Sequence, residues 1–393
     1  MPTHVRTIQT AVPPTSLDQT VARDIFAGQD GLTRLGERLV RASFDGSGIS
    51  TRQTVIEDLG AAPVTGDPVF YDRESGVLLS PSTRTRNEVY IDAASRLFVE
   101  AAERALDACA DIEASDVTHV VTVSCTGFFA PGPEYRIVRS LGLAPTTERL
   151  HIGFMGCYGA FAALRVAAAF CESNPDAVVL VVCCEVCTIH VRSSNDPDQI
   201  VASSVFADGA AAAIVTGRPG PAGSTSLTVD QLSTELTPVG EDDMAWTIGD
   251  AGFDMVLSAA VPKIIDTYIR PALEPLFVNE PHLSADPAGA ITHWAIHPGG
   301  RSILDKVESN LGLSVSQLVP SRRVLRDYGN MSSGTVLFVL KDILDGDGDG
   351  DLDLDGDGGG DVGGDPEQGE RVCAMAFGPG LTVETGLFTR VTR

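Results

Sequence analysis

An unbroken apolar run at residues 177–184, AVVLVVCC, limits what this chain can fold into more than any other feature. The run is far too short to span a bilayer, and such runs bounded by turn residues are typical of strands buried on both faces. Strand-like segments recur along the chain, at 117–127, 150–156, 203–217, 291–300, 335–344 and 371–377. Helix-like patterns stand between them, at 91–112, 157–173, 253–275 and 301–312. This alternation predicts an α/β fold with a sheet covered on both faces.

A Pro-, Gly- and Ser-rich segment, RPGPAGSTS at 218–226, divides the pattern. It predicts a connection between two halves, residues 1–218 and 219–393. Each half places a polar or reactive residue where a buried strand gives way to a loop or helix. We therefore predict a duplicated α/β domain built around one shared site.

The charge balance narrows the choice of partners. The net charge is −25, and the tract at 345–365 alone contributes nine Asp, which leaves −16 elsewhere. Such a field argues against nucleic acid or an anionic membrane, so an anionic substrate requires a local group of arginines. The N-terminus has no apolar run after its basic residues, which predicts a soluble, cytoplasmic protein. The eight cysteines lack zinc-ligand spacing, so we expect reduced thiols and no metal.

The tract itself, DGDGDGDLDLDGDGGGDVGGD, superficially resembles a calcium loop. Read from Asp345, it has Asp347, Asp349 and Gly350 in EF-hand register, but Gly356 stands where a bidentate Glu is needed. Unpaired carboxylates on a Gly-rich chain repel one another and stay solvated, which favours a disordered loop. A calcium-binding or scaffold protein acting through this tract stays open as an alternative.

The turn GFMGCYGA places Cys157 between Gly156 and Gly159, at the predicted start of a buried helix. Unpaired N–H groups and the helix dipole favour a thiolate there, and the small neighbours let a carbonyl group approach. A small apolar residue packing the helix end is the equally weighted alternative.

Two further residues stand at element ends. His297 ends the apolar segment HWAIHPGG beside an open Gly-rich loop, and Asn330 in YGNMSSG precedes a segment predicted as a buried strand. Singly, they could be a hydrogen-bonded core histidine and a turn cap. Cys, His and Asn together predict acyl-transfer chemistry.

Five segments in the same order give the chain a resemblance to the type III polyketide synthases, the chalcone-synthase-like branch of the thiolase superfamily. They are GFMGCYGA, VFADGAAAAIV, HPGGRSILDKVE, YGNMSSGTVLF and AFGPGLTVET, the last with Ala376 in place of a Gly. The resemblance covers about residues 52–389. It implies a duplicated thiolase-type αβαβα layered fold, with Cys157 as nucleophile and His297 and Asn330 as its partners.

The resemblance also implies a pocket. Phe206 would be a gatekeeper and Phe253 a second one, while Gly378 and Pro379 belong to the cyclisation-pocket loop. Departures from the chalcone synthase pattern, together with two neighbours, would line the cavity; these residues are Cys125, Cys187, His190, Met244 and Ser332. They argue against a coumaroyl starter and favour the bacterial branch, a fatty acyl starter and a pyrone, resorcinol or related product.

The implied substrates are acyl-CoA and malonyl-CoA, with no cofactor. Arg41 and Arg52 lie in the region where the family binds CoA, whereas Arg38 is equally well explained as a surface residue. A homodimer is implied, because the position of Ala130 contacts the partner's cavity in the family.

Two relatives of this family offer rival functions. An initiating-type ketoacyl-ACP synthase also uses Cys, His and Asn, but HPGG, FGPG and Phe206 favour the polyketide synthase. A thiolase would need a second reactive cysteine, and Cys373 lies inside an apolar segment, which predicts a core residue.

Overall fold

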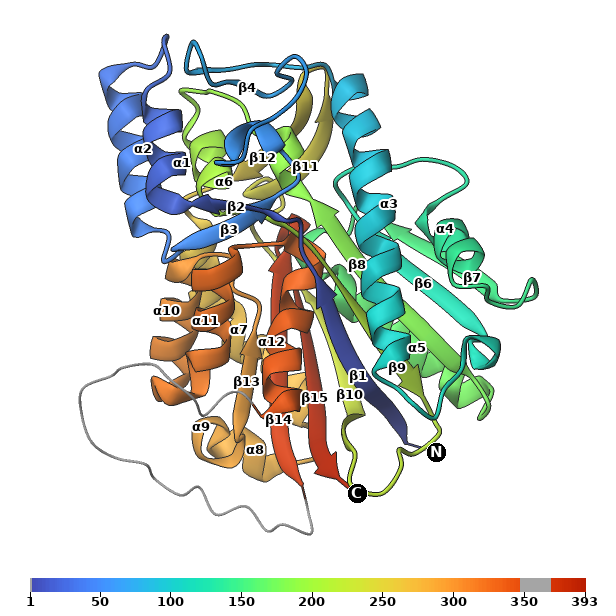
Figure 1. Cartoon of the computed structure of the whole chain (residues 1–393). Coiled ribbons are helices and arrows are strands. Elements are labelled where there is room, and N and C mark those ends of the chain that lie inside the picture. The colour runs from blue at the N-terminus through green and yellow to red at the C-terminus, as the bar shows by residue number, and fades with distance from the viewer. Residues whose placement is uncertain (1, 347–368) are drawn as a thin grey trace.

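The computed structural model describes residues 2–346 and 369–393 (Figure 1). Nearly all of the acidic tract therefore lies outside the described residues, and the disordered loop and the calcium site both stay predictions. In the described part of the chain, no helix is long and apolar enough to cross a membrane.

Nine strands of the described chain form one sheet in the order β13-β14-β15-β10-β1-β9-β8-β6-β7. On one side of the sheet, β1 pairs antiparallel with β9, β9 pairs antiparallel with β8, and β8 pairs parallel with β6. On the other side, β10 pairs antiparallel with β15, β15 pairs antiparallel with β14, and β14 pairs parallel with β13. Only a short antiparallel pairing of β1 with β10 joins the two sets. The predicted α/β class and the duplicated layout are thus confirmed. The strands of this sheet are β1 (Thr3–Ala11), β6 (His119–Ser124), β7 (Glu148–Gly153), β8 (Val178–Val186), β9 (Asp208–Thr216), β10 (Thr225–Leu236), β13 (His293–Ile296), β14 (Glu370–Gly378) and β15 (Thr382–Thr392).

Helices separate and cover the two sets of strands. The long helix α3 (Thr83–Asp107) packs on β1, β8 and β9, whereas α5 (Gly159–Ser173) and α12 (Thr335–Asp345) share a core with strands of both halves. The helix α7 (Val261–Phe277) covers β10 and β15, and α10 (Arg301–Leu311) packs on α7. The result is a layered α/β/α/β/α arrangement with α5 and α12 in the middle.

Smaller elements complete the chain. Three two-stranded sheets lie outside the main sheet, and their strands are β2 (Thr15–Asp18) with β3 (Thr51–Thr54), β4 (Tyr71–Asp72) with β5 (Val77–Leu78), and β11 (Met244–Gly249) with β12 (Gly252–Leu257). The remaining helices are α1 (Gln19–Ala27), α2 (Arg34–Gly46), α4 (Pro133–Ser140), α6 (Pro197–Val205), α8 (Pro281–Ala285), α9 (Pro287–Ala290) and α11 (Val319–Tyr328).

The prediction of a strand at 335–344 is wrong, because this segment is the helix α12. Its residues from Thr335 to Leu340 are all buried, since the helix lies in the middle layer with strands on either side. A helix buried all round is apolar all round, so its sequence shows no amphipathic period and reads like a central strand.

The prediction of one helix over 253–275 is also wrong in its first part. Residues 252–257 form the strand β12, and α7 begins only at Val261. Phe253 therefore lies in the hairpin of β11 and β12, which forms its own small sheet beside the first half.

Candidate active site

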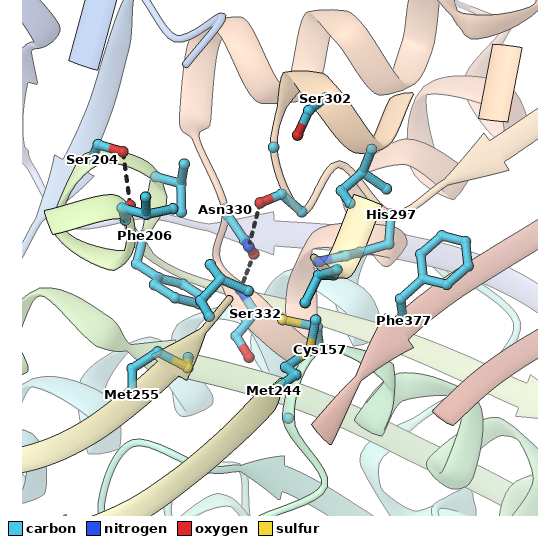
Figure 2. A pocket seen from close by; sticks show the side chains of 18 of the residues that line it. Cys157, Ser204, Phe206, Met244, Met255, His297, Ser302, Asn330, Ser332 and Phe377 are labelled. Carbon is cyan, nitrogen blue, oxygen red and sulfur yellow. Dashed lines mark hydrogen bonds between the residues drawn. The ribbon is translucent and has the colours of Figure 1, made fainter. Parts of the chain in front are cut away.

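Three element ends bring Cys157, His297 and Asn330 together. Cys157 lies in the turn η3 (Gly156–Tyr158) that opens α5, His297 directly follows β13, and Asn330 precedes η6 (Ser332–Gly334) and α12. All three line one cavity of about 420 Å³, and their side chains converge in Figure 2. The sequence-based prediction of a shared site at these positions agrees with this geometry.

Two glycines, Gly156 and Gly378, allow the C-terminal loop to pack closely against the turn that carries Cys157. Gly156 has φ +71°, and a Cβ there would lie 2.5 Å from Cδ of Pro379. A Cβ on Gly378 would lie 2.4 Å from the Tyr158 ring. Gly378 and Pro379 thus pack directly against the Cys157 turn, and Pro379 also lines the cavity. Only glycine fits these approaches without displacing the loop.

The Cys157 thiol and the His297 imidazole are both deeply buried. Burial raises the pKa of Cys157 to about 11, while hydrogen bonding to the side chains of Ser332 and Asn330 pulls its pKa down. Burial lowers the pKa of His297 to about 3, and neither of its ring nitrogens has a hydrogen-bond partner among the described residues. Either charge alone is therefore disfavoured, and we expect the two charges to arise together, when one proton passes from sulfur to imidazole.

The Asn330 side chain is held in one orientation. Its Oδ1 accepts from the Ser332 backbone N–H at 2.9 Å, and its Nδ2 donates to the Gly299 carbonyl at 3.3 Å. Its backbone forms two hydrogen bonds with the segment around Phe206. The Asn330 N–H donates to the Val205 carbonyl, and the Ala207 N–H donates to the Asn330 carbonyl. The other amide hydrogen of Asn330 is the one that interacts with the Cys157 sulfur.

A buried carboxylate, Glu185 near the end of β8, underlies the site. It accepts hydrogen bonds from the Cys125 backbone N–H at 2.9 Å and from the Thr126 hydroxyl at 2.8 Å, and also from the Ser333 hydroxyl. Burial raises its pKa. Glu185 was not among the predicted site residues, although a single acidic residue inside the apolar run VVCCEV is a visible signal.

Most of the predicted pocket residues line the cavity, and two do not. Those that line it are Phe206, Cys125, Cys187, Met244 and Ser332. His190 and Phe253 instead line a neighbouring hollow of about 20 Å³ behind it. Trp246, which the sequence analysis missed, lines both and donates from Nε1 to the Cys125 carbonyl at 2.7 Å.

The prediction of Arg52 as a CoA ligand is wrong. Arg52 is only 2% exposed, and its guanidinium donates to the carbonyls of Ser203 and Phe206 at 2.8 and 2.7 Å. Its charge faces the buried Asp208 and helps to hold the Phe206 segment. The prediction failed because the sequence around an arginine does not show whether the folded protein buries its side chain.

Arg41, the other predicted CoA ligand, lies on the surface. Arg41 is paired with Glu37 and Asp24 on α2 and α1 and does not line the cavity. Among the described residues, the one arginine or lysine that lines it is Arg301, at the first position of α10. The side chain of Arg301 is 59% exposed, and its Nε lies 3.6 Å from Asp305 Oδ2. Arg301 stands in the segment HPGGRSILDKVE, but it was not among the predicted site residues.

Cys373 is fully buried inside β14, and burial raises the pKa of its thiol. This agrees with the prediction of a core residue rather than a second catalytic cysteine.

Known proteins resemble this chain over nearly its whole length. Family models for the N-terminal and C-terminal domains of chalcone and stilbene synthases match residues 3–219 and 229–392. Bisdemethoxycurcumin synthase from Oryza sativa subsp. japonica is 31% identical over 98% of this chain and 91% of its own length. The structure of PKS-I from the brown alga Ectocarpus siliculosus superimposes with a TM-score of 0.86 at 26% identity, over 99% of this chain and 98% of that one. The C-terminal type III polyketide synthase domain of Steely1, a type I/III hybrid from Dictyostelium, gives a TM-score of 0.84 at 27% identity over all of both chains.

Proposed function

Because the chain belongs to the chalcone and stilbene synthase family of type III polyketide synthases, which share the thiolase-type fold, we propose that it condenses malonyl-CoA iteratively onto an acyl-CoA starter held on Cys157. The observation that carries this proposal is the convergence of Cys157, His297 and Asn330 on one cavity of about 420 Å³. The same family membership sets aside a ketoacyl-ACP synthase as the first choice.

Loading of the starter uses the Cys157–His297 pair. The thiol passes its proton to the imidazole, and the thiolate attacks the starter thioester carbonyl. A new C–S bond to Cys157 forms, the C–S bond to CoA breaks, and the CoA thiolate takes the proton from the His297 imidazolium. The acyl group then rests in a cavity walled by Phe206, which excludes water that would hydrolyse it.

Extension uses the two hydrogen-bond donors. When malonyl-CoA loses carbon dioxide, the electron pair of the breaking C–C bond passes into a thioester enolate. The His297 N–H and the Asn330 amide N–H that otherwise interacts with Cys157 are suited to stabilise the enolate oxygen, because both side chains line the cavity. The enolate carbon then attacks the Cys157 thioester, a C–C bond forms, and the thiolate of Cys157 leaves.

We propose a fatty acyl starter and a pyrone, resorcinol or related product. Support comes from the apolar character of the cavity wall, which includes Val205, Phe206, Met244, Met255 and Leu257. Each methylene that enters such a wall from water contributes about 0.8 kcal/mol, so longer starters are favoured until the cavity is full. The bacterial branch stays a prediction, since the relatives named above come from a plant, an alga and Dictyostelium.

We further propose that the enzyme works as a homodimer in the cytoplasm. The strand β7 lies at the edge of the sheet, and three exposed apolar side chains cluster on or near it, Phe128, Leu150 and Phe154. The ring centroids of Phe128 and Phe154 lie 6.2 Å apart. Ala130, the residue expected to face the partner, lies in an exposed loop beside them. An unpaired edge with an apolar rim is suited to pairing with a second copy.

Product mass spectrometry with malonyl-CoA and a series of starter acyl-CoAs tests the proposed function. Extended, cyclised products formed without an acyl carrier protein are expected, and a strict requirement for the carrier would favour the ketoacyl-ACP synthase. Size-exclusion chromatography with light scattering tests the dimer separately, and a monomer at working concentration would contradict it.

A further inference from the structure

The helix α6 ends inside the protein, directly before the cavity-wall residue Phe206. The last carbonyl groups of a helix have no partner within the helix, and a buried carbonyl without any partner is costly. Four carbonyls at this end accept hydrogen bonds from other segments, and they belong to Ser203, Ser204, Val205 and Phe206. The position of this part of the wall therefore depends on the donors that reach it.

Arg52 on β3 supplies two of these four hydrogen bonds. Its Nη1 donates to the Ser203 carbonyl at 2.8 Å and to the Phe206 carbonyl at 2.7 Å. The side chain is 2% exposed and does not line the cavity. The charged group that interacts with it is Asp208 on β9, and its guanidinium lies 5.4 Å from the ring centroid of Phe44 on α2. Arg52 is therefore a buried cation whose hydrogen bonds go to the backbone of the cavity wall.

The same backbone segment is joined to Asn330. The Asn330 N–H donates to the Val205 carbonyl at 2.9 Å, and the Ala207 N–H donates to the Asn330 carbonyl at 2.8 Å. The two chains are also closely packed, because a Cβ on Gly329 would lie 3.1 Å from the Val205 carbonyl oxygen. Figure 2 shows Phe206 and Asn330 side by side on the cavity. A displacement of the Phe206 backbone is therefore passed to Asn330.

We propose that Arg52 is a positioning residue that holds the Phe206 and Asn330 segments in place and is thereby needed for malonyl-CoA decarboxylation. This inference rests on the proposed function, in which the Asn330 amide stabilises the enolate. A misplacement of such a group by about 1 Å can cost about 10²-fold in rate. Loading of the starter uses the pair of Cys157 and His297, so it depends less on Arg52.

Arg52→Lys tests the inference because it makes the proposed support depend on pH. Burial lowers the pKa of the Arg52 guanidinium to about 10. The same lowering would give a lysine ammonium at this position a pKa of about 8. Below that pH the ammonium can donate to the wall carbonyls, whereas the neutral amine above it donates only weakly.

The readout is the rate of malonyl-CoA decarboxylation divided by the rate of Cys157 acylation by a starter acyl-CoA, with each variant expressed relative to the wild type. This relative ratio is expected to fall about tenfold in Arg52→Lys between pH 7 and pH 9, as the lysine loses its proton. A ratio that does not change with pH would overturn the inference, and so would decarboxylation and acylation that decline in parallel.

Arg86→Lys is the matched control. Arg86 is fully buried, burial lowers its pKa to about 10 as well, and its guanidinium also donates to backbone carbonyls, those of Ile189 and Val191. Neither carbonyl belongs to the segments of Phe206 and Asn330. Arg86→Lys is expected to lower the melting temperature while its relative ratio stays constant from pH 7 to pH 9. An equal fall in Arg86→Lys would show a general effect of a buried lysine and overturn the inference.

If Arg52→Lys does not fold, Gln19→Met provides the second probe. The Gln19 Nε2 donates to the Ser204 carbonyl at 2.8 Å, so the change removes one of the four hydrogen bonds and keeps the length of the side chain. The relative ratio is expected to fall about two- to tenfold at every pH, and an unchanged ratio would overturn the inference. Failure of the wild-type enzyme to decarboxylate malonyl-CoA would instead overturn the proposed function.

Discussion

Replacing His297 by Gln tests whether Cys157 is reactive only as part of an ion pair. Burial holds the pKa of the Cys157 thiol at about 11 when no imidazolium is charged beside it. Without His297, only about one thiol in 10³ is ionised at pH 8. Cysteines activated by a neighbouring imidazolium titrate at or below about 7.5, so we expect most of the sulfur in the wild-type pair to be thiolate at pH 8.

The fraction of Cys157 that is thiolate, taken alone, overstates the difference in alkylation rate between the wild-type protein and His297→Gln. A thiolate with a pKa lower by about 4 is intrinsically about 10²-fold less nucleophilic. The wild-type protein is therefore expected to react about tenfold faster than His297→Gln at pH 8 and about 10²-fold faster at pH 7. Its rate becomes independent of pH above about 8, whereas the variant's rate rises tenfold per pH unit up to about pH 11.

Iodoacetamide alkylation followed by peptide mass spectrometry measures these rates at Cys157 and separates it from the other seven cysteines, which are also buried and free. His119→Gln serves as the control, with a wild-type profile expected. Identical pH profiles for the wild type and His297→Gln would refute the ion pair, and so would a wild-type rate that rises tenfold per unit through pH 9.

Four further outcomes follow from the same geometry. Asn330→Ala is expected to slow malonyl-CoA decarboxylation by about 10²–10³-fold while acylation of Cys157 persists, and equal loss of both would contradict the assigned role. Gly156→Ala forces a side chain into a left-handed turn 2.5 Å from Pro379 and is expected to destabilise the protein by about 2–4 kcal/mol, measured by urea unfolding; unchanged stability would show that the loop moves freely. Arg301→Ala is expected to raise KM for acyl-CoA about fivefold, or about 1 kcal/mol, but not KM for a thioester that lacks the nucleotide, and equal effects would remove Arg301 from phosphate binding. Burial lowers the pKa of His190 to about 3, so the unfolded chain takes up this proton first and stability falls as pH drops below 6.5; His190→Gln is expected to remove about 3 kcal/mol of the loss between pH 6.5 and pH 4, and an unaltered pH dependence would show that His190 is not held neutral.

The reactive residues were predictable because each follows a strong local signal. Cys157 stands between glycines before an apolar helix, and His297 stands at the end of an apolar strand, so both positions could be read from the chain itself. Asn330 was placed at a shared site even though the segment after it was misread. A residue just before α12 and a residue just before a central strand both lie at the same edge of the core. The wrong element type therefore did not change the expected position of Asn330.

Other features depend on tertiary packing that no local pattern records. Arg52 looks like a surface arginine in sequence, and only the fold reveals that its guanidinium satisfies the carbonyls behind Phe206. Trp246 and Phe253 lie in a hairpin whose cross-strand register brings one ring to the cavity and the other behind it. Their sequence distance from the nucleophile gives no hint of that contact.

The measurement that tests the central claim most directly is mass spectrometry of the protein after brief incubation with a fatty acyl-CoA. An acyl group on the peptide containing Cys157, absent from Cys157→Ala and displaced when malonyl-CoA is added, is the predicted result. Acylation of another residue, or an acyl group retained by Cys157→Ala, would contradict the account.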